Sequence, residues 1–378
     1  MSTEPTAQIR EHFGHVTDPR VDRTKLHALL DIIAIAICAV ICGADSWVEV
    51  EQFGHEKEAW LRTFLALPNG IPSHDTIGDL FARLDPDEFE RGFLSWIAAI
   101  ANLTQGEVVA MDGKRLRRSH DHLLGKNAIH MVSAWASANH LVLGQVKVDD
   151  KSNEITAIPQ LLSMLVLQGC VVTLDAMGCQ SEIADQIVAQ GADYMLALKG
   201  NHGHLLDDVT DIFQTAHAVQ FKDVVHDSAK TSDKAHGRIE TRRCWTLSEP
   251  HELQYLRDRK DWPQLRTLVM IESTRRVGLT HSTETRYYLC SLTVSAERAL
   301  EIVRTHWSIE NELHWVLDIA FQEDDCRVRQ GHGAQNFSRL RHLALNLLKR
   351  ESSAKVGIKA KRLKAGWSLD YLLKVLAH

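Results

Sequence analysis

The sequence predicts an α/β protein in which an all-α N-terminal domain precedes a mixed β-sheet covered by helices. Apolar residues recur at helical spacing through residues 1–104, short β-branched runs begin near Glu107, and a long helical pattern returns over residues 295–321. On these observations the 378 residues divide into an all-α domain over 1–104, an α/β domain over 105–350 and a basic C-terminal tail over 351–378.

The N-terminal domain is predicted from four helical segments. Residues 26–42 are dominated by Leu, Ile and Ala, and residues 47–67 place apolar side chains at helical spacings. Two further helices follow, one capped by Ser73 and the other opened by Asp85. The most apolar stretch, residues 32–44, is too short for a membrane span, so we interpret it as a buried helix.

The middle of the chain alternates between strands and helices. Strands are predicted at 108–111, 128–136, 141–148, 170–174 and 194–198, and helices at 155–168 and 181–190. This order implies a mixed sheet with helices on its faces, and it matches the ribonuclease-H-like topology. Residues 203–292 are irregular and strand-rich, and we interpret them as an insertion within this domain. Its candidate strands lie at 224–225, 239–247, 267–272 and 286–292.

Composition and charge limit the classes of protein to consider. The seven cysteines include no CxxC pair and are odd in number, which argues against a zinc ribbon or a disulfide framework. The first residues lack an apolar signal core, so the expected location is the cytoplasm. Residues 327–378 carry twelve Lys or Arg and two acidic residues, a net of +10 within a chain of net −6. Such a segment suits a phosphate-binding surface, and a solvated basic helix fits the charge as well.

Two aspartates follow apolar strands. Asp112 comes directly after Val-Val-Ala-Met, and Asp175 directly after Val-Val-Thr-Leu. An ionised side chain at the end of a buried strand is costly unless a cation or hydrogen-bond donors meet it, although a single such aspartate is more simply a turn residue. If both converge at one sheet edge, their oxygen ligands suit Mg²⁺. A metal pair held there would activate a water or a 3′-hydroxyl for in-line displacement.

A third carboxylate is expected on the predicted helix over residues 295–321. Glu310 shares a helix face with His306 and His314, which lie one turn before and one turn after it. The acidic triplet at residues 323–325 is the alternative source of this ligand. The same triplet would otherwise form a charged turn at the end of the helix.

Six short motifs are spread over nearly the whole chain. They are Asp18-Pro19-Arg20, Ile71-Pro72-Ser73-His74-Asp75-Thr76, Asp112-Gly113-Lys114, Leu174-Asp175-Ala176, Leu198-Lys199-Gly200-Asn201-His202 and His306-Trp307-Ser308-Ile309-Glu310. Together they resemble the insertion-sequence transposases of the transposase-11 family, most closely the H-repeat-associated proteins of enteric bacteria. The resemblance implies that Asp112 and Asp175 are the first two catalytic carboxylates. It also implies that Glu310, in its Trp-x-Ile-Glu context, is the third, and we therefore prefer Glu310 to the acidic triplet.

The chain departs from the family's usual signature around this glutamate. Val303 and His306 stand where related transposases carry Tyr and Arg, and Leu317 stands where they carry Lys. Candidates to grip the terminal phosphate instead are Lys114, Arg304, His306 and His314. Further residues expected to contact DNA, each with a loop or turn role as the alternative, are Arg115, Arg117, Arg118, Lys199 and Asn201.

The resemblance implies a DDE transposase that cuts and joins double-stranded DNA at the terminal inverted repeats of an insertion element. It implies Mg²⁺ as the cofactor, with Mn²⁺ able to substitute, and synapsis of two DNA ends favours a homodimer. The all-α domain would then serve DNA binding or assembly. Two alternatives stay open: a catalytically silent DNA-binding remnant of a transposase, and a zinc metallohydrolase that uses His306, Glu310 and His314. The second would leave Asp112 and Asp175 unexplained.

Overall fold

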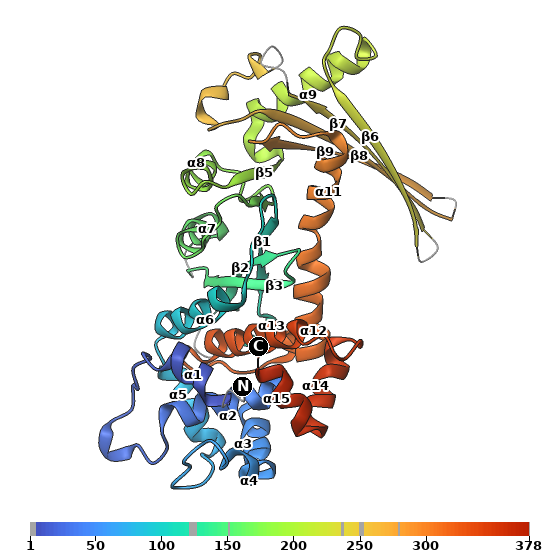
Figure 1. Cartoon of the computed structure of the whole chain (residues 1–378). Coiled ribbons are helices and arrows are strands. Elements are labelled where there is room, and N and C mark those ends of the chain that lie inside the picture. The colour runs from blue at the N-terminus through green and yellow to red at the C-terminus, as the bar shows by residue number, and fades with distance from the viewer. Residues whose placement is uncertain are drawn as a thin grey trace.

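The computed structural model describes residues 5–120, 127–149, 152–235, 238–248, 253–278 and 280–377. The molecule is elongated, with a helical bundle at one end, a β-sheet in the middle and a strand-rich extension at the other end (Figure 1). Helices from both ends of the chain form the bundle, so both termini lie at the same end of the molecule (Figure 1). No helix within the described residues combines the length and the apolar character needed to cross a membrane.

The N-terminal helices begin at capping residues and surround one apolar helix. They are α1 (Pro5–Phe13), α2 (Leu29–Ile41), α3 (Trp47–Glu56), α4 (Glu58–Leu61), α5 (His74–Arg83) and α6 (Pro86–Ile100). Ser73 caps α5 and Asp85 caps α6, as the sequence predicts, and Ser46 forms a capping box at the start of α3. Every residue of α2 except Leu30 is buried, which confirms that the most apolar stretch is a core helix.

The C-terminal helices complete the same bundle. They are α13 (Gly333–Arg350), α14 (Ile358–Trp367) and α15 (Leu369–Leu376). On α13, Arg339 forms a buried ion pair with Glu90 of α6. On α14, Arg362 donates to the carbonyl oxygen of Val40 at the end of α2, at 3.0 Å. The beginning and the end of the chain therefore share one core.

Burial changes what the basic C-terminal segment can do. Arg339, Arg341, Lys361 and Arg362 are all buried. Lys361, for example, donates to the carbonyl oxygen of Leu348 at 2.8 Å. These four cationic side chains are not available to a ligand on the surface. A phosphate-binding surface on this segment therefore has to come from its remaining basic residues.

Within the described residues, nine strands form one mixed sheet. They are β1 (Val108–Arg115), β2 (His130–Ala136), β3 (Leu141–Lys147), β4 (Val171–Leu174), β5 (Asp193–Leu198), β6 (Asp227–Ala235), β7 (Arg238–Leu247), β8 (Thr267–Val277) and β9 (Thr280–Cys290). Their order is β3-β2-β1-β4-β5-β9-β8-β7-β6. The β1–β4 and β4–β5 pairs are parallel, and the other neighbouring pairs are antiparallel.

The strands of segment 203–292 continue the central sheet. After α9 (Gly203–Ala218), the strands β6 to β9 form a long antiparallel ribbon, and β9 pairs with β5. The expected strand at 224–225 is wrong, because β6 begins only at Asp227. Phe221 and Asp223 have positive φ values of 57° and 60°, so the backbone just before this short apolar run is not in an extended conformation.

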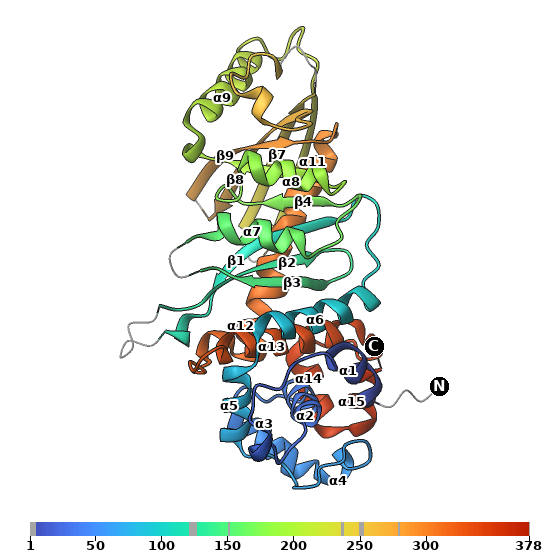
Figure 2. The same ribbon diagram turned by 90° about the vertical axis from the view of Figure 1, so that its left-hand side faces the viewer.

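Helices cover both faces of the sheet. α7 (Glu154–Ser163) and α8 (Ser181–Ala189) lie over one face, in front of the strands in Figure 2. α11 (Ala296–His306) runs along the opposite face (Figure 1). Side chains divide between the two faces because successive residues of a strand point in opposite directions. Short 3₁₀ turns lie at Asp22–Thr24, Arg117–Ser119, Gly200–His202, Arg259–Asp261 and Glu323–Asp325.

Candidate metal centre

Asp112 lies on β1, Asp175 directly follows the adjacent parallel strand β4, and both lie on the same side of the sheet. β1 and β4 run in register up to the residues just before the two aspartates. Side chains alternate between the two faces along a strand, so Asp112 lies on the same face as Val108, and Asp175 on the same face as Val171. Both valines pack against residues of α11. Asp112 does not end its strand, contrary to the sequence prediction, because β1 continues to Arg115 by pairing with β2.

Two side chains pack closely against the glycine after Asp112. A Cβ at Gly113 would displace the carboxylate of Glu154 and the ring of His130 from their present positions. Those two residues form an ion pair at 2.9 Å. The Asp-Gly pair thus lets the first residue of α7 approach the strand that carries Asp112.

Glu310 lies on a helix that contains a π-helical segment. α11 continues through the π-helix η5 (Ile309–His314) into α12 (Trp315–Phe321), in agreement with the long helix predicted over 295–321. The N–H of Trp315 donates to the carbonyl oxygen of Glu310, which is a π-helical rather than an α-helical interval. Both Glu310 and His314 lie within this wide turn, and such turns are frequent at functional sites.

Asp112, Glu310 and His314 form a compact cluster. Within the described residues their ligand atoms all lie within 4.8 Å of one another. The His314 Nδ1 atom is 3.6 Å from Asp112 Oδ2 and 3.4 Å from Glu310 Oε2. Its Nε2 atom is buried and has no hydrogen-bond partner in the described part of the chain.

The electrostatics of this cluster fit a divalent cation. Burial raises the pKa of Asp112 to about 7, although His314 opposes the rise. The hydrogen bond with His314 lowers the pKa of Glu310. A buried carboxylate that keeps a proton up to neutral pH, next to an ionised one, leaves a place where a cation can replace the proton. Two carboxylates with few other ligands are a donor set that Mg²⁺ accepts.

Asp175 stands beside the cluster rather than in it. Its Oδ1 atom accepts hydrogen bonds from the backbone N–H groups of Met177, at 2.9 Å, and Gly178, at 3.3 Å. The compact cluster found among the described residues does not include Asp175. Its carboxylate instead borders a cavity of about 180 Å³ on the α11 side of the sheet.

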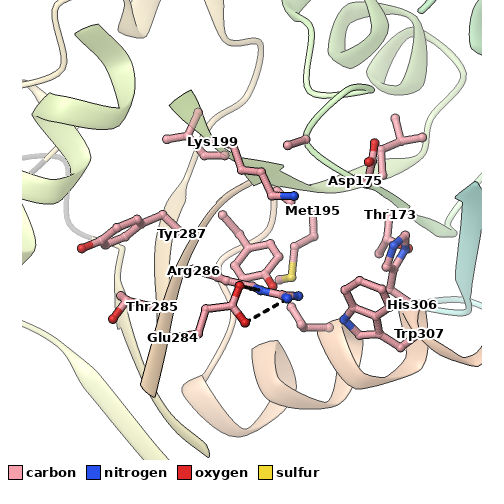
Figure 3. A pocket seen from close by; sticks show the side chains of 16 residues that line it. Thr173, Asp175, Met195, Lys199, Glu284, Thr285, Arg286, Tyr287, His306 and Trp307 are labelled. Atoms are coloured by element: carbon pink, nitrogen blue, oxygen red, sulfur yellow. Dashed lines mark hydrogen bonds and ion pairs between the residues drawn. The ribbon is translucent and has the colours of Figure 1, made fainter. Parts of the chain in front are cut away.

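This cavity, which we call the Asp175 cavity, is lined by polar and aromatic residues (Figure 3). The His306 Nδ1 atom lies 2.9 Å from the hydroxyl oxygen of Thr173. Burial lowers the pKa of His306 to about 4, so its ring is neutral near pH 7. The Arg286 guanidinium lies 5.1 Å from the centre of the Trp307 ring, and the Lys199 amine points into the space between Asp175 and Trp307 (Figure 3).

Lys114 is engaged inside the protein. Its amine pairs with Asp318 of α12 and lies 3.0 Å from Glu323, and its side chain is only 12% exposed. Arg341 lies 3.9 Å from the same glutamate. Burial alone would raise the pKa of Glu323, but Lys114 and Arg341 bring it down to about 2. These ion pairs join the strand of Asp112 to the helix of Glu310.

The acidic triplet at 323–325 is paired with the basic loop after β1. Arg117 lies 3.1 Å from Asp324, and Arg118 lies 3.2 Å from Asp325. The carboxylate beside Asp112 is therefore that of Glu310. The side chain of Arg115, by contrast, is exposed.

The remaining residues that the sequence singled out lie at separate places. Asn201 donates to the carbonyl oxygen of Ala176 at 2.9 Å and so fixes the loop after Asp175. Arg304 lies 3.2 Å from Asp233 of β6. His306 contacts Thr173 rather than the cluster, so a zinc site of His306, Glu310 and His314 does not assemble among the described residues.

Two features of the site escaped the sequence analysis. Arg286 reaches Trp307 from β9, and its only signal was a position at the start of a candidate strand. Glu312 lies 2.6 Å from His140 and 3.5 Å from Lys349, contacts that bridge the π-helical turn to the turn before β3 and to α13. Neither contact has a local sequence pattern, because the partners are far apart in the chain.

Comparison with protein-family models matches two regions of the chain. Residues 10–97 match a family described as DDE_Tnp_1-associated. Residues 103–347, which are more than half of the chain, match the family described as Transposase DDE domain.

Comparison with individual proteins agrees with the family models. The chain is 39% identical over 374 residues to "H repeat-associated putative transposase YhhI" of Escherichia coli (strain K12), covering 98% of both chains. It is 40% identical over 372 residues to "Putative transposase YncI" of Escherichia coli O157:H7, covering 98% of this chain and 94% of that one. A solved piggyBac transposase synaptic complex with hairpin DNA matches at 9% identity with a TM-score of 0.44, covering 98% of this chain and 81% of that one, a likeness too distant to characterise the fold. The two matched regions and the full-length relatives show that the chain belongs to the DDE transposase family.

Proposed function

We propose that this transposase catalyses metal-dependent cleavage and transfer of DNA strands at the ends of an insertion element, with Asp112, Asp175 and Glu310 as its metal-binding catalytic carboxylates. The observation that carries the proposal is the placement of Asp112 on β1 and of Asp175 directly after the adjacent parallel strand β4, both on the sheet face that the helix of Glu310 covers. Mg²⁺ is the proposed metal, and Mn²⁺ is expected to substitute for it.

Strand order supports a ribonuclease-H-like catalytic domain over residues 105–350. The segment β3-β2-β1-β4-β5 has an antiparallel meander followed by parallel strands, with α7 and α8 as the crossovers. We assign residues 203–292 to an insertion that lengthens this sheet, residues 1–104 to DNA binding or assembly, and residues 351–378 to a basic C-terminal segment.

The chain's own residues would prepare the site for the reaction. When bound, the metal supplies charge stabilisation for the attacking and leaving oxygens of an in-line phosphoryl transfer. His314 contacts both Asp112 and Glu310 and can keep the two carboxylates oriented. Neutral His306 can offer a phosphate a hydrogen bond but no charge. Lys199 and Arg286 are the lysine and the arginine among the residues that line the Asp175 cavity.

We propose double-stranded DNA with terminal inverted repeats as the partner, bound by a homodimer that holds two ends together. Membership of the DDE transposase family, and the similarity to proteins named as putative transposases, support DNA as the substrate. Because the proposed substrate is cellular DNA, we expect the protein to act in the cytoplasm. Proposed phosphate contacts include the exposed Arg115 and the cavity residue Lys199.

A cleavage assay on DNA that carries the sequences flanking the gene tests the proposal. With Mg²⁺ or Mn²⁺, Asp175→Asn should lower strand cleavage by roughly a hundredfold or more, because a metal ligand is lost. Asp207→Asn, which changes an exposed carboxylate on α9, is the matched control and should retain activity. Binding of the ends without cleavage by the unaltered chain would instead identify a catalytically silent remnant.

A further inference from the structure

Along one face of the ribbon of β6 to β9, the residues change from apolar near the central sheet to charged further out. Near the sheet, this face carries Cys244, Ile271 and Tyr288, which are buried against α11. Further out, the same alternation brings charged residues to the face, with Arg242 two positions from Cys244 and Arg286 two positions from Tyr288. The apolar root of the ribbon therefore packs on the helix, while its outer half overhangs the helix with polar groups.

The space under this overhang is a groove of about 460 Å³, which we call the ribbon groove. Glu240 and Glu284 line it, and so does Asn311, which directly follows Glu310 on the helix. Arginine side chains dominate its charge, and they are Arg238, Arg242, Arg275, Arg286 and Arg304.

Carboxylates hold part of this arginine set in place. Arg242 lies 2.9 Å from Asp233 and 2.7 Å from Glu240. Asp233 also lies 3.2 Å from Arg304, which ties the ribbon to α11. Arg238 and Arg275 are exposed at the outer part of the groove. Five arginines against the two lining carboxylates and the adjoining Asp233 leave the groove with a net positive charge.

The ribbon groove adjoins the Asp175 cavity. Arg286, Tyr288 and Trp307 line both spaces, and so does Glu284, which pairs with Arg286 at 2.8 Å. A chain of negative groups bound along the ribbon would thus continue past Arg286 to Asp175. Among polymers, a nucleic-acid strand offers such evenly spaced charge, and guanidinium groups match phosphate oxygens in a two-pronged geometry.

We propose that the ribbon groove binds the sugar-phosphate backbone of the DNA segment next to the phosphate that is cut. This inference rests on the proposed function and adds a binding surface on β7, β8 and β9 to it. Contacts of this kind hold the DNA in position without reading its sequence. The groove should therefore contribute to binding of any duplex, and its contribution should weaken as salt rises.

The test compares two double variants that differ only in the face of the ribbon. Arg238→Gln with Arg275→Gln changes the groove face, and Arg243→Gln with Arg276→Gln changes the opposite face of the same strands. Binding of a synthetic duplex of arbitrary sequence is followed by fluorescence anisotropy over a range of salt concentrations. Each lost phosphate contact lowers the salt slope by about 0.9, so the groove variant should lose about 1.8 and bind more weakly, while the control keeps the unaltered slope.

The outcomes separate this inference from the function on which it rests. If the unaltered chain binds no duplex at any salt concentration, the proposed function fails. If the unaltered chain binds and both double variants keep its slope, the groove assignment is overturned while the function stands. If the groove variant changes the oligomeric state measured by light scattering and leaves the salt slope intact, the groove is a contact between copies of the chain and the assignment is equally overturned.

Discussion

Asp112 should destabilise the metal-free protein, and its replacement by asparagine should reveal by how much. Burial raises the pKa of Asp112 from an ordinary 3.8 to about 7. Because the folded pKa is the higher one, the cost of ionising Asp112 in the folded state begins as pH rises above 3.8 and is complete above about 7. A difference of about three pKa units corresponds to about 4 kcal/mol. Asparagine avoids this cost but must satisfy its own amide, so we expect Asp112→Asn to raise the free energy of unfolding by about 2 kcal/mol at about pH 8.

The assay is urea unfolding of the metal-free unaltered chain and the variant across this pH range. The urea concentration at the unfolding midpoint should be nearly the same for Asp112→Asn and the unaltered chain at about pH 4. The excess of the variant's midpoint should be largest above pH 7. Addition of Mn²⁺ should stabilise the unaltered chain and leave Asp112→Asn unchanged, because a ligand stabilises only the state that binds it. Asp207→Asn, the exposed control, should follow the unaltered chain throughout. A gain that is the same at every pH, or an asparagine variant that is less stable at high pH, would refute the reasoning.

Three further predictions concern the residues around this centre. Lys114→Met should cost about 3 kcal/mol in urea unfolding, because it removes the nearest cation from the buried Glu323 and from the partly exposed Asp318 and leaves Glu323 with Arg341 alone. Lys25→Met removes an exposed ion pair and should cost less than about 1 kcal/mol, and equal losses in the two variants would contradict the buried role of Lys114. The pKa of Glu323 is lowered from its ordinary 4.5 to about 2, so ionised Glu323 contributes about 3 kcal/mol to the free energy of unfolding. This contribution is fully present above pH 4.5 and is lost as pH falls through 2. Glu323→Gln should flatten this acid dependence, and an unchanged pH profile would exclude Glu323 as its source. His314→Gln should weaken Mn²⁺ binding by about tenfold to a hundredfold in calorimetry, and unaltered affinity would remove His314 from the site.

The shared sheet face of Asp112 and Asp175 was predictable because its signal is local. An apolar run followed by an aspartate indicates a buried strand and a carboxylate that needs a cation or hydrogen-bond donors. In the structure, Asp112 and Asp175 both lie on the sheet face that α11 covers. The end of β1 was not predictable from the same run. Its extension to Arg115 depends on pairing with β2, whose partner residues, from His130 onward, lie beyond the reach of a local pattern.

Which of the predicted residues lie together could not be predicted from sequence, because it depends on contacts that form only in the folded chain. The sequence placed Glu310, His306 and His314 on one α-helical face, but the structure divides them between two sites. Glu310 and His314 lie within the π-helical turn and stay together, whereas His306 is the last residue of α11 and contacts Thr173. The π-helix has no distinct periodicity over so few residues. The charge of Lys114 likewise suggested a DNA contact, whereas its partners Asp318 and Glu323 lie about two hundred residues further along the chain.

The shared core of the two chain ends has a consequence for synthesis. α2 is almost fully buried, and it leaves the ribosome long before α13 and α14 exist to cover it. Arg362 and Val40, which hold this core together, are 322 residues apart. The neighbouring helices α1 and α3 can cover part of α2 early, but the part that packs on α13 and α14 stays exposed until the end of translation. Loss of those last helices should therefore silence the transposase as completely as loss of a carboxylate, by leaving the core of its first helices incomplete.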